Sequence, residues 1–377
     1  MNYYLKVTLN MNKDFSGLVR DTLESLGVLR FTLQSGRMVV LSDRRWPLGL
    51  GGDGVYESPL DSFEFFIPLK NSEPLLNTLV ALLHLDSPGR GSLFTEKIKL
   101  HASDPPALVN EPSEKLPQKL GGLESAHPLF SDLLLISCIV QRGRGNDVAK
   151  AALHSVAGVP WINYGTGAGL RERLGLIRIT IPAEKETVNL VVSQEEGVQV
   201  ISSLIREARL NYPGQGFIYA CPIQKGVINT RLSMDRSRHL ATMEQIIQTL
   251  DLLKGSPTWR RKVSSAEVQP QLFQEEKEPE VDMTFYCIQG NASRLVEAAR
   301  RAGASGATIC KIRQGQKIIP GPKEVMPALE VAHLVIRRSL EEKVLQALET
   351  AGLFQGDFPG YCEVKPVSHS FTYRPEG

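Results

Sequence analysis

Apolar and polar residues along the chain change period in an order that repeats. Alternation with a period of two indicates strands, and apolar residues three or four apart indicate helices. The middle copy reads in order as a strand at Leu133–Val140, a helix at Asn146–Val156, a short strand ending in Gly165–Gly169, a strand at Thr187–Val192, a helix at Glu196–Leu210 and a strand entered through Gly214–Phe217. This order predicts one βαββαβ unit.

The same order is found on both sides of the middle copy. The third copy reads as strand Met283–Ile288, helix Ala292–Ala302, strands Ala307–Ile312 and Ala328–Ile336, helix Leu340–Ala351 and strand Gly360–Val364. The first copy reads as strand Tyr3–Leu9, helix Phe15–Leu26, strands Leu29–Leu33 and Asp61–Pro68, helix Pro74–Leu85 and strand Ser92–Lys99. Glycines recur before the last strand of each copy, at Gly89–Gly91, Gly214–Gly216 and Gly356–Gly360.

The pattern therefore predicts an α+β fold of three tandem ferredoxin-like βαββαβ domains. The helices of each domain cover only one face of its antiparallel sheet, so the other face needs a partner. We expect these faces to meet around a pseudo-threefold axis. Ligand clefts would then lie between neighbouring domains of the same chain.

Two segments break the periodicity and are predicted to be linkers. Ser103–His127 contains Asp-Pro-Pro and Gly-Gly, and Gly255–Asp282 is rich in Gln and Glu. Both compositions favour exposed, mobile chain. Leu240–Leu253 has apolar residues at helical spacing and predicts an added amphipathic helix. The expected division is domain one at 1–102, a linker at 103–128, domain two at 129–234, a helix and acidic linker at 235–281, and domain three at 282–377.

Composition narrows the functional classes. The 43 basic and 41 acidic residues give a net charge of +2, which is too balanced for a nucleic-acid-binding surface. The first residues lack the apolar segment of a signal peptide, and no apolar run approaches the ~20 residues that span a bilayer. We expect a cytoplasmic protein that binds no nucleic acid.

The chain offers no pattern typical of a metal site or an enzyme. Its five cysteines form no Cys-x-x-Cys pair and lie in apolar strand-like runs, so we expect reduced, buried thiols. There is no Gly-x-Ser-x-Gly elbow and no Walker loop. A dinucleotide fingerprint starting at Gly165 would need a glycine where Leu170 stands. We expect a non-enzymatic protein without a metal and without a required cofactor.

The middle copy resembles the PII signalling proteins and their PII-like relatives between Leu133 and about Arg231. The resemblance rests on Gly143–Gly145 after the first strand, Tyr164–Gly169 after the second, Ile181–Glu186 before the third and Gly214–Phe217 before the fourth. PII-like proteins are homotrimers that bind adenine nucleotides in clefts between subunits. The resemblance implies a PII-like trimer fused into one polypeptide, acting as a monomer.

Two departures from the PII pattern limit what the resemblance implies. PII proteins usually have a lysine that contacts phosphates where this chain has Phe217. No tyrosine lies between Gly169 and Glu186, so uridylylation is not expected. These departures favour AMP or ADP over ATP as the effector.

The predicted ligand site lies at the junction of copies two and three. Backbone N–H groups of glycine-rich loops can converge on phosphate oxygens. Gly306 and Thr308 occupy the place where PII-like proteins contact adenine. The predicted ligand-binding residues are Gly165, Thr166, Gly167, Ala168, Gly169, Gly214, Gln215, Gly216, Phe217, Gly306 and Thr308. A plain loop, a hairpin-like turn and the start of a buried strand are the structural alternatives for these three segments.

Three hypotheses for function follow. The first is a sensor that binds one adenine nucleotide per chain and reports it through Leu170–Glu186, with Arg171 and Arg173 near the phosphate. The resemblance implies a membrane transporter or a metabolic enzyme as the target. The second is an interaction scaffold that has lost ligand binding. The third and weakest is cation handling, as in CutA-like proteins.

Overall fold

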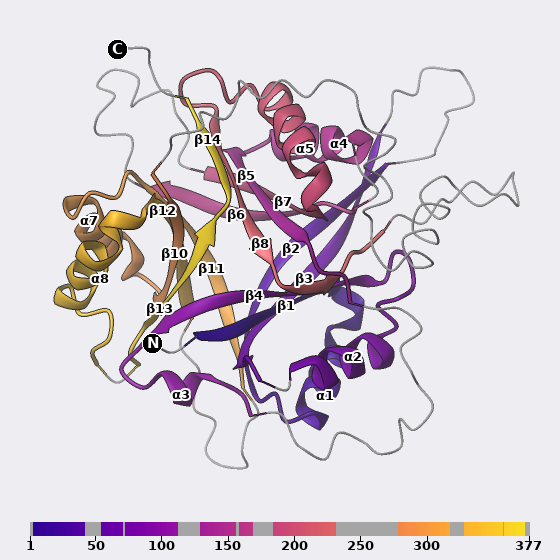
Figure 1. Ribbon diagram of the computed structural model, residues 1–377, viewed down its shortest axis with the longest axis horizontal. Helices are drawn as coiled ribbons and strands as arrows, with labels where there is room; N and C mark the ends of the chain where they lie inside the picture. Colours follow the sequence, from indigo (N-terminus) through magenta and orange to yellow (C-terminus); the bar gives the residue numbers. More distant parts are fainter. Residues whose placement is uncertain are drawn as a thin grey trace, which may run out of the picture.

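The computed structural model describes residues 3–41, 54–70, 72–111, 129–155, 158–168, 184–230, 278–316, 328–356 and 358–373. It confirms the α+β class. The strands join in one 14-stranded sheet in which every pair of named strands is antiparallel. Figure 1 shows helices on the outside of the molecule and the strands between them. None of the helices in these residues has the length and apolar composition to cross a bilayer.

Three segments have the same element order, and we refer to them as units 1, 2 and 3. Unit 1 comprises β1 (Tyr3–Asn12), α1 (Ser16–Ser25), β2 (Arg30–Leu41), β3 (Val55–Pro68), α2 (Ser72–Leu83) and β4 (Gly91–His101). Unit 2 comprises β5 (Leu133–Gln141), α4 (Gly145–Ser155), β6 (Trp161–Ala168), β7 (Glu184–Ser193), α5 (Gln194–Glu207) and β8 (Gly216–Ile223). Unit 3 comprises β10 (Glu280–Ile288), α7 (Ala292–Arg301), β11 (Ala307–Gln316), β12 (Leu329–Arg337), α8 (Glu341–Thr350) and β13 (Tyr361–Val367).

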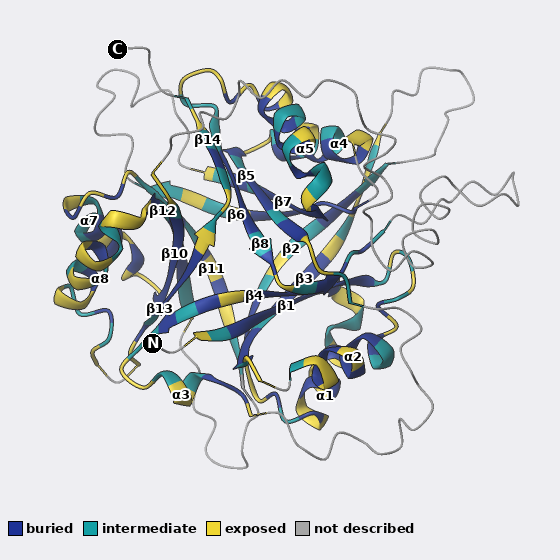
Figure 2. Cartoon of the chain, viewed as in Figure 1, coloured by how far each residue is buried: buried dark blue, intermediate teal, exposed yellow. Residues whose placement is uncertain are grey.

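Each unit buries its own apolar core between its helices and one face of its strands. In β10, Met283 and Phe285 pack with Leu295 of α7 and Val344 of α8, because successive side chains of a strand point to opposite faces. Comparable clusters lie in unit 1 and unit 2. Figure 2 shows the exposed residues on the outer helices and the buried ones along the strands.

A carboxylate on the third strand holds the start of the first helix in every unit. Glu186 accepts from the backbone N–H groups of Gly143 (3.0 Å) and Gly145 (2.7 Å). Glu330 accepts from Gly290 (2.9 Å) and Ala292 (3.2 Å), and Asp61 accepts from the Ser16 hydroxyl (2.6 Å). Carboxylates are favourable at helix N-termini. These three carboxylates serve as reference points for comparing the units. We call two positions of different units equivalent when they lie at the same distance, counted along the paired strands, from Asp61, Glu186 or Glu330 of their own unit.

The units are joined edge to edge at one common register. Arg37 of unit 1 pairs with Ile162, Thr166 of unit 2 pairs with Ile309, and Arg313 of unit 3 pairs with Leu33. Arg37, Thr166 and Arg313 are equivalent, because each lies two residues beyond the partner of its unit's carboxylate. The second strands therefore form a closed ring of contacts from unit 1 to 2, from 2 to 3, and from 3 to 1.

Short extensions after the fourth strands bind the neighbouring units. β9 (Lys225–Val227) pairs with β4, and β14 (His369–Thr372) pairs with β8. The end of β4 pairs with β13 at Leu100 and Glu363. Neither β9 nor β14 was predicted, because strands this short show too little alternation to stand out from loops.

The structure adds detail to one predicted linker and corrects the prediction of one loop. The linker expected from residue 103 begins with the helix α3 (Pro105–Leu108), and the Asn110 side chain is buried and accepts from the N–H groups of Leu29 and Arg30. Gly165–Ala168, expected as a loop, belongs to β6. The helix predicted at Leu240–Leu253 lies outside the described residues. The domain boundaries at 102, 128, 234 and 281 stay predictions.

The inner faces of units 1 and 3 meet at buried charges. Lys6 contacts Glu363 (2.8 Å) and Glu64 (3.1 Å), and Lys365 contacts Glu96 (2.7 Å). Burial would lower the pKa of Lys6, but the nearby carboxylates, with Glu363 first, raise it well above its usual value. Burial raises the pKa of Glu363 to about 7, although both lysines oppose this shift.

The raised pKa of Glu363 predicts that stability falls as pH increases. The folded protein holds this proton more tightly than the unfolded chain, so stability is highest below the unfolded pKa and is lost as pH rises through about 7. We expect the wild type to lose on the order of 2 kcal/mol relative to Glu363→Gln between pH 5 and pH 8. Urea unfolding at both pH values measures this difference.

The exposed substitution Glu342→Gln on α8 is the control and should follow the wild type. Burial lowers the pKa of His333, so buried histidines of this kind change the stability with pH in the opposite direction. Because both proteins contain these histidines, the difference between the wild type and Glu363→Gln does not include their contribution. Identical pH profiles for the wild type and Glu363→Gln would contradict the prediction.

Candidate functional site

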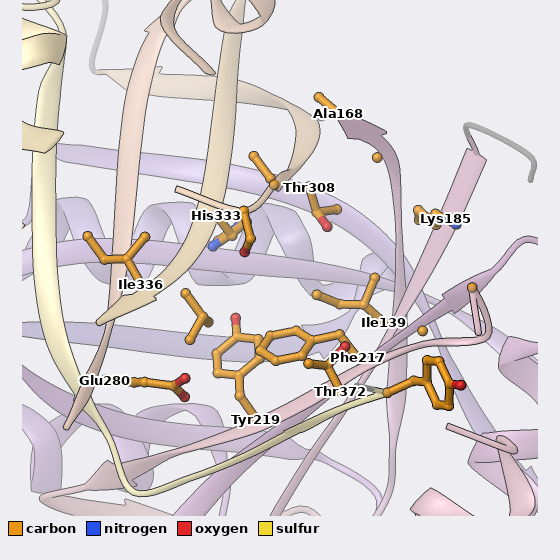
Figure 3. A pocket seen from close by; sticks show the side chains of 18 of the residues that line it. Ile139, Ala168, Lys185, Phe217, Tyr219, Glu280, Thr308, His333, Ile336 and Thr372 are labelled. Carbon is orange, nitrogen blue, oxygen red and sulfur yellow. The ribbon is translucent and has the colours of Figure 1, made fainter. Parts of the chain in front are cut away.

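A cavity of about 990 Å³ lies between units 2 and 3 (Figure 3). It lies at the junction where the sequence predicted a site. Most of the predicted ligand-binding residues line it: Gly167, Ala168, Gly214, Gly216, Phe217, Gly306 and Thr308. Unit 2 contributes the end of β6 and the start of β8, and unit 3 contributes the start of β11 and the second half of β12.

The other predicted residues are not part of the lining. Gly165 and Thr166 lie further back in β6. Gln215 turns its side chain toward Arg144, whose guanidinium lies 3.5 Å from the amide oxygen. Gly169, Arg171 and Arg173 lie outside the described residues.

Gly165 is explained by strand packing and not by ligand contact. A Cβ atom at this position would lie 2.8 Å from Thr308 Cγ2 and 3.1 Å from the Ile309 carbonyl oxygen. Only glycine therefore lets β6 and β11 approach this closely. The expectation that Gly165–Gly169 forms a loop with free donors is wrong for Gly165–Ala168. These residues belong to β6, which pairs with the neighbouring strands β7 and β11.

The cavity has an aromatic side. Phe217 and Tyr219 stack with ring centroids 5.5 Å apart and planes 21° apart, and Ile139 and Ile336 also line the space. Burial raises the pKa of Tyr219 well above its usual value, so its hydroxyl stays neutral. A planar apolar group can lie against this side, because aromatic rings bind flat partners by offset stacking.

Charged groups are few and lie around the aromatic side. Lys185, Arg337 and Glu280 line the cavity. Arg337 lies 3.7 Å from Glu278, and Glu280 accepts from the hydroxyl of Ser370. Sequence reasoning missed these residues, because a single charge at the end of a strand is indistinguishable from a solvated surface residue.

His333 adds a neutral acceptor to the cavity. Its Nδ1 lies 3.0 Å from the Thr284 hydroxyl, which donates to Asp282 at 3.0 Å. Since Thr284 uses its proton on Asp282, His333 Nδ1 carries the hydrogen and Nε2 is left as an acceptor. Burial lowers the pKa of His333, so the ring is uncharged at neutral pH. A ligand N–H or O–H group can bind there.

The equivalent junction between units 1 and 2 is filled. Met38 is equivalent to Gly167, Leu60 to Lys185, and Trp161 to Thr308. All three large side chains are buried in one apolar cluster, where Trp161 packs 6.1 Å from Phe94 between ring centroids. The space that is open between units 2 and 3 is occupied by protein in this junction.

Arginine side chains form contacts across the junctions of units 1 and 2 and of units 3 and 1. Arg37 of unit 1 donates to Glu186 of unit 2 at 3.1 Å and to Asn146 at 3.0 Å. Arg313 of unit 3 donates to Ser35 of unit 1 at 2.7 Å. The equivalent residue of unit 2 is Thr166, which carries no charge. The junction with the open cavity therefore differs from the other two in this contact as well.

The cysteines offer no nucleophile at the cavity. All five are buried and free, as expected from the sequence. Burial raises the pKa of Cys138 and Cys310 to about 12, so both thiols are protonated at neutral pH. Among the described residues, no three His, Cys, Asp or Glu side chains are grouped to hold a metal ion.

Comparisons with known proteins add little to this description. No family model and no curated protein matches the chain. Among solved structures, PII from Arabidopsis thaliana bound to citrate is similar to part of it, with 19% identity over 28% of this chain and 96% of that chain, and a TM-score of 0.21. A TM-score this low does not identify a fold, so the fold rests on the strand pairing described above.

The filled and open junctions predict unequal costs for truncating two equivalent residues. Trp161→Ala should destabilise the protein by about 3–5 kcal/mol, because it leaves a hole in a close-packed cluster. Thr308→Ala should cost about 1 kcal/mol, because the side chain already borders an open cavity. Urea unfolding of both variants at one pH measures the difference. Equal costs would show that the two junctions are packed alike.

Proposed function

We propose that this chain is a non-enzymatic, PII-like regulatory protein whose three units act as a trimer within one monomeric polypeptide. Its effector is an adenine nucleotide bound between units 2 and 3. The observation that carries the proposal is the cavity lined by Gly167, Gly214, Phe217 and Thr308. The glycine pattern of the sequence predicts ligand binding by these same four residues.

The lining favours a nucleotide with few phosphates. The adenine ring would lie near Gly306 and Thr308 against the aromatic side, with His333 Nε2 accepting from a ligand N–H or O–H group. The phosphate would bind at Gly214, Gly216 and Lys185. Among the described lining residues, the two cations Lys185 and Arg337 face one carboxylate, Glu280. This balance suits AMP or ADP better than the higher charge of ATP.

Signalling would start at Lys185. This residue lines the cavity, pairs with Gly165 near the start of β7, and belongs to the segment Leu170–Glu186 that is proposed as the reporter. A ligand phosphate at Lys185 would favour one arrangement of that segment over others, since a ligand shifts a protein toward the state that it binds best. The target would be a membrane transporter or a metabolic enzyme in the cytoplasm.

Calorimetric titration of the full chain with AMP, ADP, ATP and cyclic AMP tests the proposal. We expect one site per chain and tighter binding of AMP or ADP than of ATP. Lys185→Leu should weaken AMP binding at least tenfold, because it removes the ammonium group that would bind the phosphate. Leucine stands at the equivalent positions 60 and 329, so the fold accepts this side chain. Thr308→Trp should abolish binding by filling the cavity as Trp161 fills the junction of units 1 and 2.

Lys343→Leu on the exposed face of α8 is the matched control and should leave binding unchanged. Absence of binding by every nucleotide would favour the second hypothesis, a scaffold that has kept the fold and lost the ligand. Three equal sites per chain would contradict the assignment to one junction. Thermal unfolding of each variant separates lost binding from lost folding.

A further inference from the structure

A second cavity of about 230 Å³ lies between units 3 and 1. It is built from positions equivalent to those of the larger cavity, but their chemistry differs. Leu329 stands in place of Lys185, and Phe358-Pro359 stands in place of Gly214-Gln215. These changes remove the lysine, place a phenylalanine side chain where unit 2 has a glycine, and place a proline, which has no N–H group, where unit 2 has a glutamine. The second cavity therefore offers fewer donors to an anion than the larger cavity does.

Aromatic side chains from both units surround this cavity. Tyr286 and Tyr361 stack with ring centroids 4.3 Å apart and planes 16° apart. Phe66 meets Tyr361 edge-on at 5.7 Å, and Phe31 and Phe358 complete the lining. Burial raises the pKa of Tyr286 and of Tyr361 well above the usual value, so neither phenol ionises. Neutral aromatic walls of this kind bind cations through the negative faces of their rings.

Carboxyl groups outnumber ammonium groups beside the cavity. Glu64 lines the space in the position equivalent to His333. It contacts the buried cluster, in which Lys6 and Lys365 face Glu64, Glu96, Asp282 and Glu363. The ammonium of Lys6 already lies 5.8 Å from the centroid of the Tyr286 ring. Arg30 is exposed at the edge of the cavity, and its guanidinium donates a hydrogen bond to the Ala107 carbonyl oxygen.

We propose that the cavity between units 3 and 1 binds a small organic cation, of the quaternary ammonium or alkylammonium class. The rings of Tyr286, Tyr361 and Phe66 surround the cationic group, and Glu64 supplies the opposite charge. The volume fits a ligand of several heavy atoms and excludes a nucleotide. The proposal does not depend on nucleotide binding in the larger cavity.

Calorimetric titration of the full chain with choline chloride tests the site. The neutral compound 3,3-dimethylbutan-1-ol has the same shape without the charge and is the matched control ligand. We expect saturable binding of one choline per chain, at least tenfold tighter than the alcohol. Equal affinity for both compounds would show an apolar pocket, and no saturable binding of choline would overturn the proposal.

Two substitutions locate the bound cation. Leu329→Lys places a positive charge where unit 2 already has Lys185, and it should abolish choline binding while the protein stays folded. Glu64→Gln should weaken binding at least tenfold. Phe217→Leu alters only the larger cavity and should leave choline binding unchanged. Choline binding that survives Leu329→Lys, or that is lost in Phe217→Leu, would place the ligand elsewhere and refute the assignment.

Discussion

The arrangement of the three units depends on buried charges whose signs are reversed between equivalent positions of units 1 and 3. Lys6 and Asp282 are equivalent, as are Glu96 and Lys365, so each position carries opposite signs in the two units. The exchange allows Lys365 to meet Glu96 at 2.7 Å across the junction. In an assembly of identical subunits, like charges would occupy all equivalent positions. Because a buried charge that loses its partner is strongly destabilising, these pairs favour the arrangement in which the two faces meet.

Unit 2 takes no part in this exchange, and the consequence is visible at its two junctions. The positions of unit 2 that are equivalent to these charges are Leu135 and Cys221, which offer no charge to either neighbour. Toward unit 1, apolar packing around Trp161 closes the junction. Toward unit 3 the junction stays open, and the strand pairs β6–β11 and β14–β8 hold the units together. Backbone hydrogen bonds leave the side-chain space free, which is the condition for a cavity in a stable fold.

The sequence predicted the parts of the fold that produce periodic patterns. The helices and most strands of the three units lie within about four residues of their predicted bounds, and the sequence pointed to the junction of units 2 and 3 through Gly214–Phe217 and Gly306. Unit 1 is the exception, because β2 continues to Leu41 beyond the predicted end at Leu33, and β3 begins at Val55 and not at Asp61. Other features leave no such pattern. Lys6 and Glu363 are charged residues in strands, which normally indicates a solvated face, and their burial depends on a partner more than 350 positions away. Gly165 was assigned to ligand contact because close strand approach and phosphate binding both require glycine.

Fusion of the units explains why the three equivalent junctions can differ so much. At each junction, the end of the second strand of one unit lies beside the start of the second strand of the next unit. Gly167 therefore lines the junction of units 2 and 3, whereas the equivalent residue Met38 packs in the junction of units 1 and 2. A substitution in one subunit of a homotrimer would change all three junctions together, and filling one would close all of them. In a single chain, Trp161 can stabilise one junction while Thr308 leaves another open. The apolar packing that closes one junction and the open cavity of another are therefore separated between junctions, and neither limits the other.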